Sequence, residues 1–504
     1  MADLSEFRVG GGIATDLSAL EPVEPPGQPT TPYRWRWVAL AVLLVAEAMD
    51  MLDALVANIA APSIRMDLGG GESTMQWLGA AYALAMAVGL ITGGRLGDIV
   101  GRRRMFLIGA AGFTAASMLC AVSVSSGMLI GARGLQGLFG AVLIPQGLGI
   151  IKEMFDGHEL GRAFGMFGPV LGLATVGGPV LAGVLIDADL FGAGWRTIFA
   201  VNLPLGLLAL IGGWKFLPES RHAVPPRLDL VGVVLASAAA LLVIFPLVQG
   251  RELGWPAWTF ASIAGGLALF ALFGRYEVRK ASAGGDPLVM PALFRKRAFS
   301  GGLVVGAVIF AALTGFSLVL SLFLQAGLGY SPLHAGLGSL PWSLGMILGF
   351  AVIQIAEKHG VVERLGRKVI QAGVAVMALG LGLLVLTLHL AGTTLTIWSL
   401  TPALLIAGLG MGLVMGPFFD TVLSAVDPEE TGTASGTLTA VQQLGGAFGT
   451  AALGTVFFSS LGRGTSPGAY TATMTSTLWS GVGLLALAFA TSFLLPRPGD
   501  RRRG

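Results

Sequence analysis

A short loop that occurs twice in the sequence decides the fold. The stretch GRLGDIVGRR at residues 94–103 has a shorter counterpart, VERLGRK, at residues 362–368. When the last glycine of each copy is aligned, Glu363 corresponds to Asp98. The two copies are 265 residues apart, about half of the 504-residue chain. Two basic residues follow that glycine in each copy. An internal repeat of this length predicts two homologous halves related in parallel, with a binding site at their interface.

Apolar stretches of about 20 residues surround both copies, and this is the length that a helix needs to cross roughly 30 Å of hydrocarbon. Such long continuous runs exclude a β-barrel, which is built from short alternating strands. The predicted fold class is an all-α integral membrane protein with fourteen transmembrane helices. They are expected at 37–59, 76–94, 105–124, 128–150, 163–186, 197–217, 230–249, 258–274, 301–325, 335–355, 369–390, 398–420, 437–459 and 476–495.

The composition excludes several functional classes. Hydrophobic residues make up 54% of the chain and charged residues only 12%, and the mean hydropathy is +0.78. A soluble enzyme of this size could not cover its surface with so few charges. The 31 basic residues nearly balance the 28 acidic ones, so we expect no nucleic-acid partner. One cysteine, five scattered histidines and no Walker motif predict no metal, no cofactor and no ATP-driven step.

The basic residues predict the orientation. With a cytoplasmic amino terminus, 26 of the 31 Lys and Arg residues fall in cytoplasmic segments, as the positive-inside rule requires. Both termini are therefore expected in the cytoplasm, and the chain in the inner (cytoplasmic) membrane of a bacterium. The expected domains are a disordered cytoplasmic tail (1–34), a six-helix bundle (35–217), a linker with two inserted transmembrane helices (218–299), a second six-helix bundle (300–495) and a basic cytoplasmic tail (496–504).

Three acids in the first span are the main candidates for function. Glu47, Asp50 and Asp53 repeat every three residues, so they share one face of a helix. An ionised carboxylate inside a membrane costs several kcal/mol unless it faces a cavity or a partner. Arg133, in the fourth span, is expected at a depth similar to that of Asp53. We hypothesise that Asp53 pairs with Arg133 and that a proton on Asp53 releases it; acids lining a wet vestibule, or a static ion pair, are the alternatives.

The repeated loop predicts a gate on the cytoplasmic face. Gly94 and Gly101 permit a tight turn and close helix packing, Asp98 is expected at the amino-terminal end of a neighbouring helix, and Arg102 opposite a carboxylate. Such charges would hold the two halves together on this side. The alternative is that the basic residues only set the orientation. The candidate gating set also includes Arg103, Glu363 and Arg367.

Two further features are weaker candidates. The fifth span carries Gly172, Gly178, Pro179 and Gly183, which permit tight helix packing and a kink, although glycine is common in membrane helices. Asp420, at the end of the twelfth span, is either a second titratable group or a solvated acid at the interface.

These features resemble the fourteen-helix drug:proton antiporters of the major facilitator superfamily, from about Trp37 to Leu495. The resemblance departs from the family pattern at Ile99, Phe139 and Ala182. Five motifs in the family's order carry it: LDALVANIAAP (52–62), GRLGDIVGRR (94–103), RGLQGLFGAVLIP (133–145), GLATVGGPVLAG (172–183) and WRTIFAVNLPLG (195–206).

The resemblance implies a transporter and not an enzyme. It implies proton coupling through the arginine at position 133, a gating role for the loop at 94–103, and export because the fifth-span motif accompanies exporters. The expected function is efflux of lipophilic or cationic small molecules in exchange for protons, by a monomer in the lipid bilayer. A dedicated exporter or an importer of one metabolite is the alternative within transport, and a membrane-embedded enzyme or a channel the alternative outside it.

Overall fold

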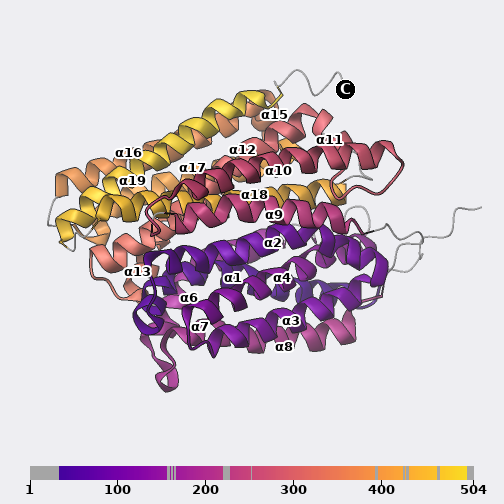
Figure 1. Ribbon diagram of the computed structural model, residues 1–504, viewed down its shortest axis with the longest axis horizontal. Coiled ribbons are helices and arrows are strands. Elements are labelled where there is room, and N and C mark those ends of the chain that lie inside the picture. The colour runs from indigo at the N-terminus through magenta and orange to yellow at the C-terminus, as the bar shows by residue number, and fades with distance from the viewer. Residues whose placement is uncertain are drawn as a thin grey trace, which may run out of the picture.

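The computed structural model describes residues 33–155, 159, 163, 166–219, 228–250, 252–391, 395–423, 426, 431–462 and 466–496. The predicted tails at 1–34 and 496–504 lie almost entirely outside these ranges. Long helices run side by side along the longest axis of the molecule (Figure 1), and no strand occurs among the described residues. The predicted all-α fold is confirmed.

The first half of the chain forms one bundle, drawn in indigo to violet in Figure 1. Its helices coincide with the predicted apolar stretches and extend beyond several of them. They are α1 (Arg36–Leu68), α2 (Glu72–Val100), α3 (Arg102–Ala121), α4 (Ser126–Met154), α6 (Phe167–Asp187), α7 (Thr197–Ala200) and α8 (Asn202–Phe216).

The second half begins after two helices that stand apart. These are α9 (Leu230–Gln249), which starts where the Asp229 carboxylate caps the Gly232 N–H at 2.9 Å, and α10 (Ala257–Ser282). The second bundle consists of α11 (Pro291–Arg295), α12 (Arg297–Leu322), α13 (Pro332–Gly338), α14 (Leu340–Lys358), α15 (Val361–Leu365), α16 (Arg367–Ala391), α17 (Ile397–Leu423), α18 (Thr431–Leu461) and α19 (Pro467–Thr491).

Eleven of the described helical segments are long and apolar enough to cross a bilayer. A twelfth is α2, which bends by 47° between its two parts, Glu72–Leu90 and Thr92–Val100. In α6, the described apolar stretch Gly177–Asp187 is shorter than a full span. The molecule is therefore a multi-span membrane protein of about eleven to twelve apolar helices.

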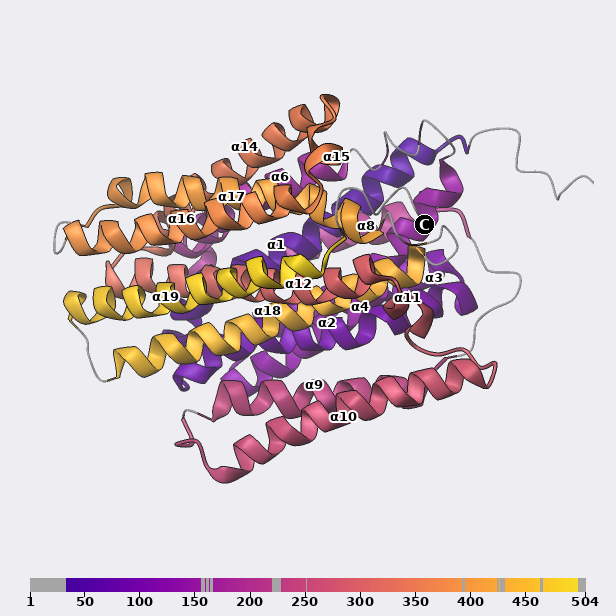
Figure 2. The same cartoon turned by 90° about the horizontal axis from the view of Figure 1, so that it is seen from above.

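The two bundles meet along two pairs of helices. Helix α2 packs against α18, and α6 packs against the short helix α13. The inserted pair lies along one flank: α9 contacts α2 and α18 at the seam, whereas α10 packs mainly on α9 and is otherwise mostly exposed (Figure 2). At one end of the molecule lie both copies of the repeated loop; we name it the loop end, and the other the far end.

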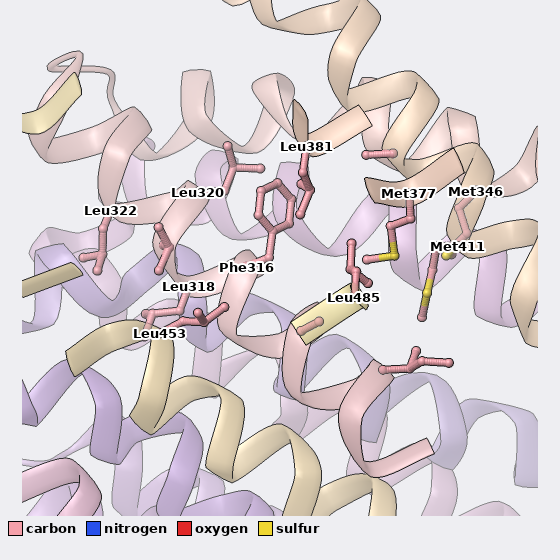
Figure 3. Packing of buried hydrophobic residues seen from close by; sticks show 14 of the residues in the cluster. Phe316, Leu318, Leu320, Leu322, Met346, Met377, Leu381, Met411, Leu453 and Leu485 are labelled. Atoms are coloured by element: carbon pink, nitrogen blue, oxygen red, sulfur yellow. The ribbon is translucent and has the colours of Figure 1, made fainter. Parts of the chain in front are cut away.

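The two bundles differ in their interiors. Leucine, methionine and phenylalanine side chains from α12, α14, α16, α17, α18 and α19 of the second bundle interlock in an apolar cluster (Figure 3), which continues into the first bundle. Helix α12 ends in a π-helical turn (Phe323–Gly327), and Gln325 of this turn donates to the Ile59 carbonyl of α1 at 2.8 Å. The second bundle is thus bonded to the first near the far end.

Candidate functional site

A buried ion pair forms the centre of the candidate site. Arg133 of α4 pairs through Nη1 with Asp53 Oδ2 of α1, and both side chains are fully excluded from solvent. Gln136 Nε2 and Asn202 Nδ2 each donate to Asp53 Oδ1 at 2.8 Å. Three donors from α4 and α8 therefore satisfy both oxygens of one carboxylate, which is the arrangement that stabilises its ionised form inside a membrane. The sequence expected Asp53 and Arg133 at the same depth, and the structure brings them into contact.

Arg133 forms further contacts besides its ion pair with Asp53. Its Nε donates to the Leu78 carbonyl of α2 at 3.1 Å, and Nη1 also donates to Gln136 Oε1 at 2.7 Å. The guanidinium carbon lies 4.4 Å from the centre of the Tyr82 ring, a cation–π geometry. Only Nη2 has no hydrogen-bond partner among the described residues. One donor of Arg133 thus remains available to a different acceptor.

The other two acids of α1 lie on the same face but are less buried. Asp50 is 8% exposed and accepts a hydrogen bond from the Tyr82 hydroxyl. Glu47, one turn closer to the loop end, is half-buried and interacts electrostatically with Asp50. Gly140 of α4 leaves room for the Asp50 carboxylate, because a Cβ there would lie 3.1 Å from its Oδ1. Exposure therefore falls from Glu47 through Asp50 to Asp53.

These groups suit the transfer of a proton. Within the described ranges, no cluster of three or more His, Cys, Asp or Glu side chains could hold a metal ion. The site consists of the carboxylates of Glu47, Asp50 and Asp53 along one face of α1, with Arg133 beside the most buried of them. A carboxylate that exchanges an arginine for a proton can couple protonation to helix movement. The proton-coupling role of Asp53, Arg133, Glu47 and Asp50 stays a prediction.

The loop motif of the first half forms contacts within that half. Asp98 pairs with Arg102, four residues further on, at 3.0 Å, and Arg102 also reaches Glu153 of α4 at 3.3 Å. Gly101, between α2 and α3, has a φ of 114°, which glycine adopts without strain, and it donates its N–H to Gly97. We expected Asp98 at the end of a neighbouring helix; among the described residues its partner is Arg102. The contacts described for Asp98 and Arg102 lie within the first half, and the gating role of these residues stays a prediction.

The neighbouring residues complete the first copy of the motif. Gly94 faces α4, where a Cβ would lie 3.7 Å from Pro145. Arg103 donates to the carbonyl oxygen of Trp214 at the end of α8. Arg95, which the sequence did not single out, donates to the carbonyl oxygens of residues 286–288 before α11. Within the motif, Arg95 is the side chain seen to contact the chain between the bundles.

The second copy repeats part of this geometry. Gly366 has a φ of 51°, positive like that of Gly101. Arg367 donates through Nη1 to the carbonyl oxygens of Phe493 and Leu495, each at 3.0 Å, next to the end of α19. Glu363 lies exposed in α15. Each half therefore uses an arginine after its loop glycine to bind carbonyl oxygens at the end of its own last helix.

The glycine-rich motif of α6 lies where the two bundles touch. A Cβ on Gly183 would lie 2.7 Å from the Leu333 nitrogen of α13, so the close approach requires glycine there. Opposite it, a Cβ on Gly336 would lie 2.8 Å from the carbonyl carbon of Pro179. Gly178 is buried, whereas the surroundings of Gly172 lie outside the described residues. This motif therefore joins the halves near the far end.

Asp420 is separate from the buried acids of α1. It lies exposed in the last turn of α17, where it interacts electrostatically with Glu357 of α14. This placement fits the alternative of a solvated acid at the interface better than that of a second buried proton carrier.

Sequence reasoning missed three residues of the site. Gln136 follows Arg133 by three positions and so shares its helix face, and this spacing was a usable signal. Asn202 is one of only two asparagines in the chain, both inside apolar spans. Tyr82 contacts Arg133 and Asp50 because α2 packs beside α1 and α4, so no local sequence pattern pointed to it.

The sequence of this chain is similar to those of known transporters. A profile described as Major Facilitator Superfamily matches residues 43–450. The "Probable actinorhodin transporter" of Streptomyces coelicolor is 49% identical, over 88% of this chain and 77% of that protein. A "Multidrug efflux pump" of Mycolicibacterium smegmatis is 32% identical, over 86% of this chain and 82% of that protein.

Solved structures show the same fold at low identity. A peptide transporter in complex with sulfate superimposes with a TM-score of 0.65 at 18% identity, covering 93% of this chain and 97% of that one. A family profile over most of the chain, relatives above 30% identity and this shared fold agree. The chain is a membrane transporter and belongs to the major facilitator superfamily.

Proposed function

We propose that the chain is a proton-coupled secondary transporter that exports lipophilic or cationic small molecules by alternating access. The observation that carries the proposal is the buried Asp53–Arg133 pair inside apolar helices. Such a pair is expensive in a membrane and is retained where it serves transport. Drug and natural-product export is supported by the relatives' names, among them the "Tetracenomycin C resistance and export protein" of Streptomyces glaucescens, 34% identical over 87% of this chain.

The proposal includes fourteen transmembrane helices with both termini in the cytoplasm. Besides the eleven or twelve apolar helices, α1 is 33 residues long and passes through the first bundle, although its three acids lower its apolar character. Helix α6 spans 21 residues, including Pro179. Fourteen is even, so both ends lie on one side, and the basic residues favour the cytoplasm. The loop end is then cytoplasmic and the far end faces outward.

In the proposed cycle, a proton binds to Asp53 in exchange for the arginine. Ionised Asp53 accepts from Arg133, Gln136 and Asn202; protonation removes its charge and weakens the first of these contacts most. Arg133 then rotates away, and because its guanidinium lies over Tyr82, the hydrogen bond from Tyr82 to Asp50 responds as well. A proton is thereby coupled to movement among α1, α2 and α4.

The far end supplies the contacts that such a cycle must break. Asp187 of α6 accepts from the Ser331 hydroxyl at 2.6 Å, and Asn58 of α1 donates to Ser317 of α12 at 3.3 Å. These bonds join the first bundle to the second. Opening toward the outside requires their loss, so we assign them to the outer gate. The loop motif at residues 94–103 is the proposed cytoplasmic gate.

Inverted membrane vesicles acidified by respiration test the proposal. Adding ethidium should release protons from vesicles that contain the wild-type protein, measured as recovery of a quenched pH-sensitive dye. Asp53→Asn should abolish this response while protein insertion remains normal. Asp67→Asn is the matched control, since Asp67 lies on the same helix but forms an exposed pair with Arg196. Proton release by Asp53→Asn equal to that of the wild type would refute the proposed coupling.

A dedicated exporter of one natural product is the second candidate. It is favoured by the 49% identity to the "Probable actinorhodin transporter", well above the 32% identity to the multidrug pump. Resistance profiles distinguish the two: deletion and overexpression should change tolerance to many unrelated lipophilic compounds in the first case and to one compound class in the second. We further propose that the protein acts as a monomer in the inner membrane of a bacterium, with the domain limits expected from the sequence.

A further inference from the structure

An apolar cavity separates the inserted helices from the rest of the molecule. Its volume is about 420 Å³, within the range of roughly 300–1,000 Å³ that small-molecule sites occupy. Its lining residues on α10 lie in the second half of that helix, and none of the described lining residues comes from α1. Figure 2 shows the flank that α9 and α10 form. The walls of the cavity come from α2, α9, α10, α11, α12 and α18, and they include the phenyl rings of Phe270, Phe273 and Phe294.

A single carboxyl group interrupts these apolar walls. Glu277 of α10 lines the cavity and is only 3% exposed. Its Oε2 accepts the Val289 N–H at 2.9 Å, whereas Oε1 has no hydrogen-bond partner among the residues that the structure describes. The carboxyl group lies within hydrogen-bonding distance of a second acid, Asp229. Two buried carboxylates in contact repel, so at most one of them is stable as an anion without further compensation.

The surrounding charges act on both acids: Lys280 forms an ion pair with Asp229 and, like Arg95, interacts electrostatically with Glu277. Asp229 Oδ1 accepts from Lys280 Nζ and from the Tyr276 hydroxyl, each at 2.9 Å. Burial opposes the ionisation of Asp229, but the Gly232 N–H, Lys280 and Tyr276 outweigh it and hold the pKa of Asp229 below its usual range.

Among the described residues, the other charged groups that act on this acid pair include Arg95 of α2, and Arg95 also interacts with Asp286. Arg95 interacts electrostatically with Asp286 and with both buried acids, and its hydrogen bonds go to the carbonyl oxygens of residues 286–288. Within the described part of the chain, Glu277 is therefore the acid without a hydrogen-bonded cation. It must hold either a proton, shared with Asp229, or a cation that enters the cavity.

We propose that this cavity is a second binding site, which takes a lipophilic cation between the three phenyl rings with its positive charge facing Glu277. Aromatic faces attract cations, and a buried carboxylate without a hydrogen-bonded cation supplies the compensating charge. A proton on Glu277 competes with the ligand, so binding weakens as the pH falls. This second site would bind the cationic compounds whose export is proposed above, and its role in the protein rests on that proposed function. Its residues are distinct from Asp53 and Arg133.

A reporter on the rim of the cavity tests the site directly. Val278 lines the cavity and is 55% exposed, whereas the native Cys120 is fully buried, so Val278→Cys can be labelled selectively with an environment-sensitive dye. Tetraphenylphosphonium added to the labelled protein in lipid nanodiscs should change the emission in a saturable way. Raising the pH from about 6 to 8 should tighten the binding.

Two variants distinguish a charge effect from a folding defect. Glu277→Gln keeps the size of the side chain and can donate to Asp229, and it should weaken tetraphenylphosphonium binding about tenfold or more and remove its pH dependence. Ala236→Phe fills the cavity without touching the acid pair and should abolish the signal. Asp53→Asn should leave the signal unchanged. Binding to Glu277→Gln that equals that of the parent protein overturns the site.

Failure of this site and failure of the proposed function give different results. If vesicles containing the wild-type protein export ethidium against protons but the reporter shows no saturable response, the lateral site is refuted and the export function stands. If the reporter responds and the vesicles release no protons with any compound, the export function fails and the cation site stands.

Discussion

The two bundles share a fold but bury different chemistry. The first bundle buries an arginine, two aspartates, glutamines and an asparagine, centred on Asp53. In the described part of the second bundle, the buried polar side chains are only serines and threonines, such as Thr477, which donates to the Thr473 carbonyl of its own helix at 2.8 Å. Counting the repeat offset of 265 residues from Asp53 leads to Leu318, which is fully buried in the apolar cluster of Figure 3.

This difference suggests to us different roles for the two bundles: packing in the second, and buried charge in the first. A membrane bundle needs no buried charge to pack, since small and apolar side chains provide the contacts. The second bundle packs in this way, through small and apolar side chains. The first bundle differs, because it buries Arg133 together with Asp50 and Asp53, for which we propose a role in proton coupling. We therefore expect variants in the two bundles to affect different properties.

The largest effect is expected for Arg133→Ala. Removing the arginine leaves Asp53 as a buried carboxylate without its cation, which should lower the free energy of unfolding by about 3–5 kcal/mol and abolish proton-coupled transport. Thermal unfolding in detergent and the vesicle assay measure the two effects. The double variant Arg133→Gln with Asp53→Asn should recover much of the stability and none of the coupling. A double variant as unstable as Arg133→Ala would contradict this.

Leu381→Ala in the second bundle should affect stability alone. Leu381 is 1% exposed in α16, and its truncation should cost about 2–3 kcal/mol, in the lower part of the usual range because only packing is lost in a membrane. Transport per folded molecule should stay near that of the wild type. A loss of proton coupling in this variant, at normal protein level, would show that the two interiors do not divide the work.

Gly183→Ala should disturb the contact between the bundles. The new methyl group would meet the backbone of Leu333, and such overpacking costs about 1–3 kcal/mol. Because the clash exists only when α6 and α13 touch, we expect it to favour separation of the far ends, seen as greater accessibility of labels placed at that end. Gly177→Ala on the same helix is the control, since no atom lies within 4 Å of its Cβ position. Equal behaviour of the two variants would rule out this explanation.

The smallest effects are expected where the bundles are most alike. Arg103→Ala and Arg367→Ala each remove hydrogen bonds to carbonyl oxygens at the end of the last helix of their half. The sites are partly exposed, so each change should cost about 1 kcal/mol or less, and the two costs should be similar. Arg104→Ala, which removes a long and exposed pair with Glu219 at 3.6 Å, should cost less than either. Arg103 and Arg367 are not aligned in the repeat, since Arg367 aligns with Arg102, so unequal costs would mean that the two contacts resemble each other in type but not in strength.

The sequence predicted the helices well because each depends on its own residues. Helix α9 covers Leu230–Gln249, the limits expected from its apolar run. Other limits differ for a physical reason: α1 continues to Leu68, beyond the apolar part that ended the prediction at 59, because a helix can extend past the hydrocarbon into water. The stretch expected at 335–355 is a short helix followed by a longer one, α13 and α14, since Pro341 begins a new first turn.

The site could be predicted only in part. The spacing of Glu47, Asp50 and Asp53 is local, and the depth of Arg133 follows from its position in a span, so their proximity was accessible from the sequence. The choice of Asp53 over Asp50 as the partner of Arg133 depends on how α4 is rotated against α1 and was settled by packing. The same holds for Asp98, whose partner proved to be Arg102.

The sequence by itself thus determined the all-helical membrane fold, the internal repeat and the presence of rare charges inside apolar spans, because transfer from water to lipid acts on each segment separately. Only the tertiary structure decided which charges meet. It placed Gln136 and Asn202 on Asp53 and gave Tyr82 contacts with both Arg133 and Asp50. It also placed Glu277, whose Oε1 has no hydrogen-bond partner in the described part of the chain, beside an apolar cavity. Contacts between residues far apart in the chain depend on the rotation and packing of whole helices, which no local pattern encodes.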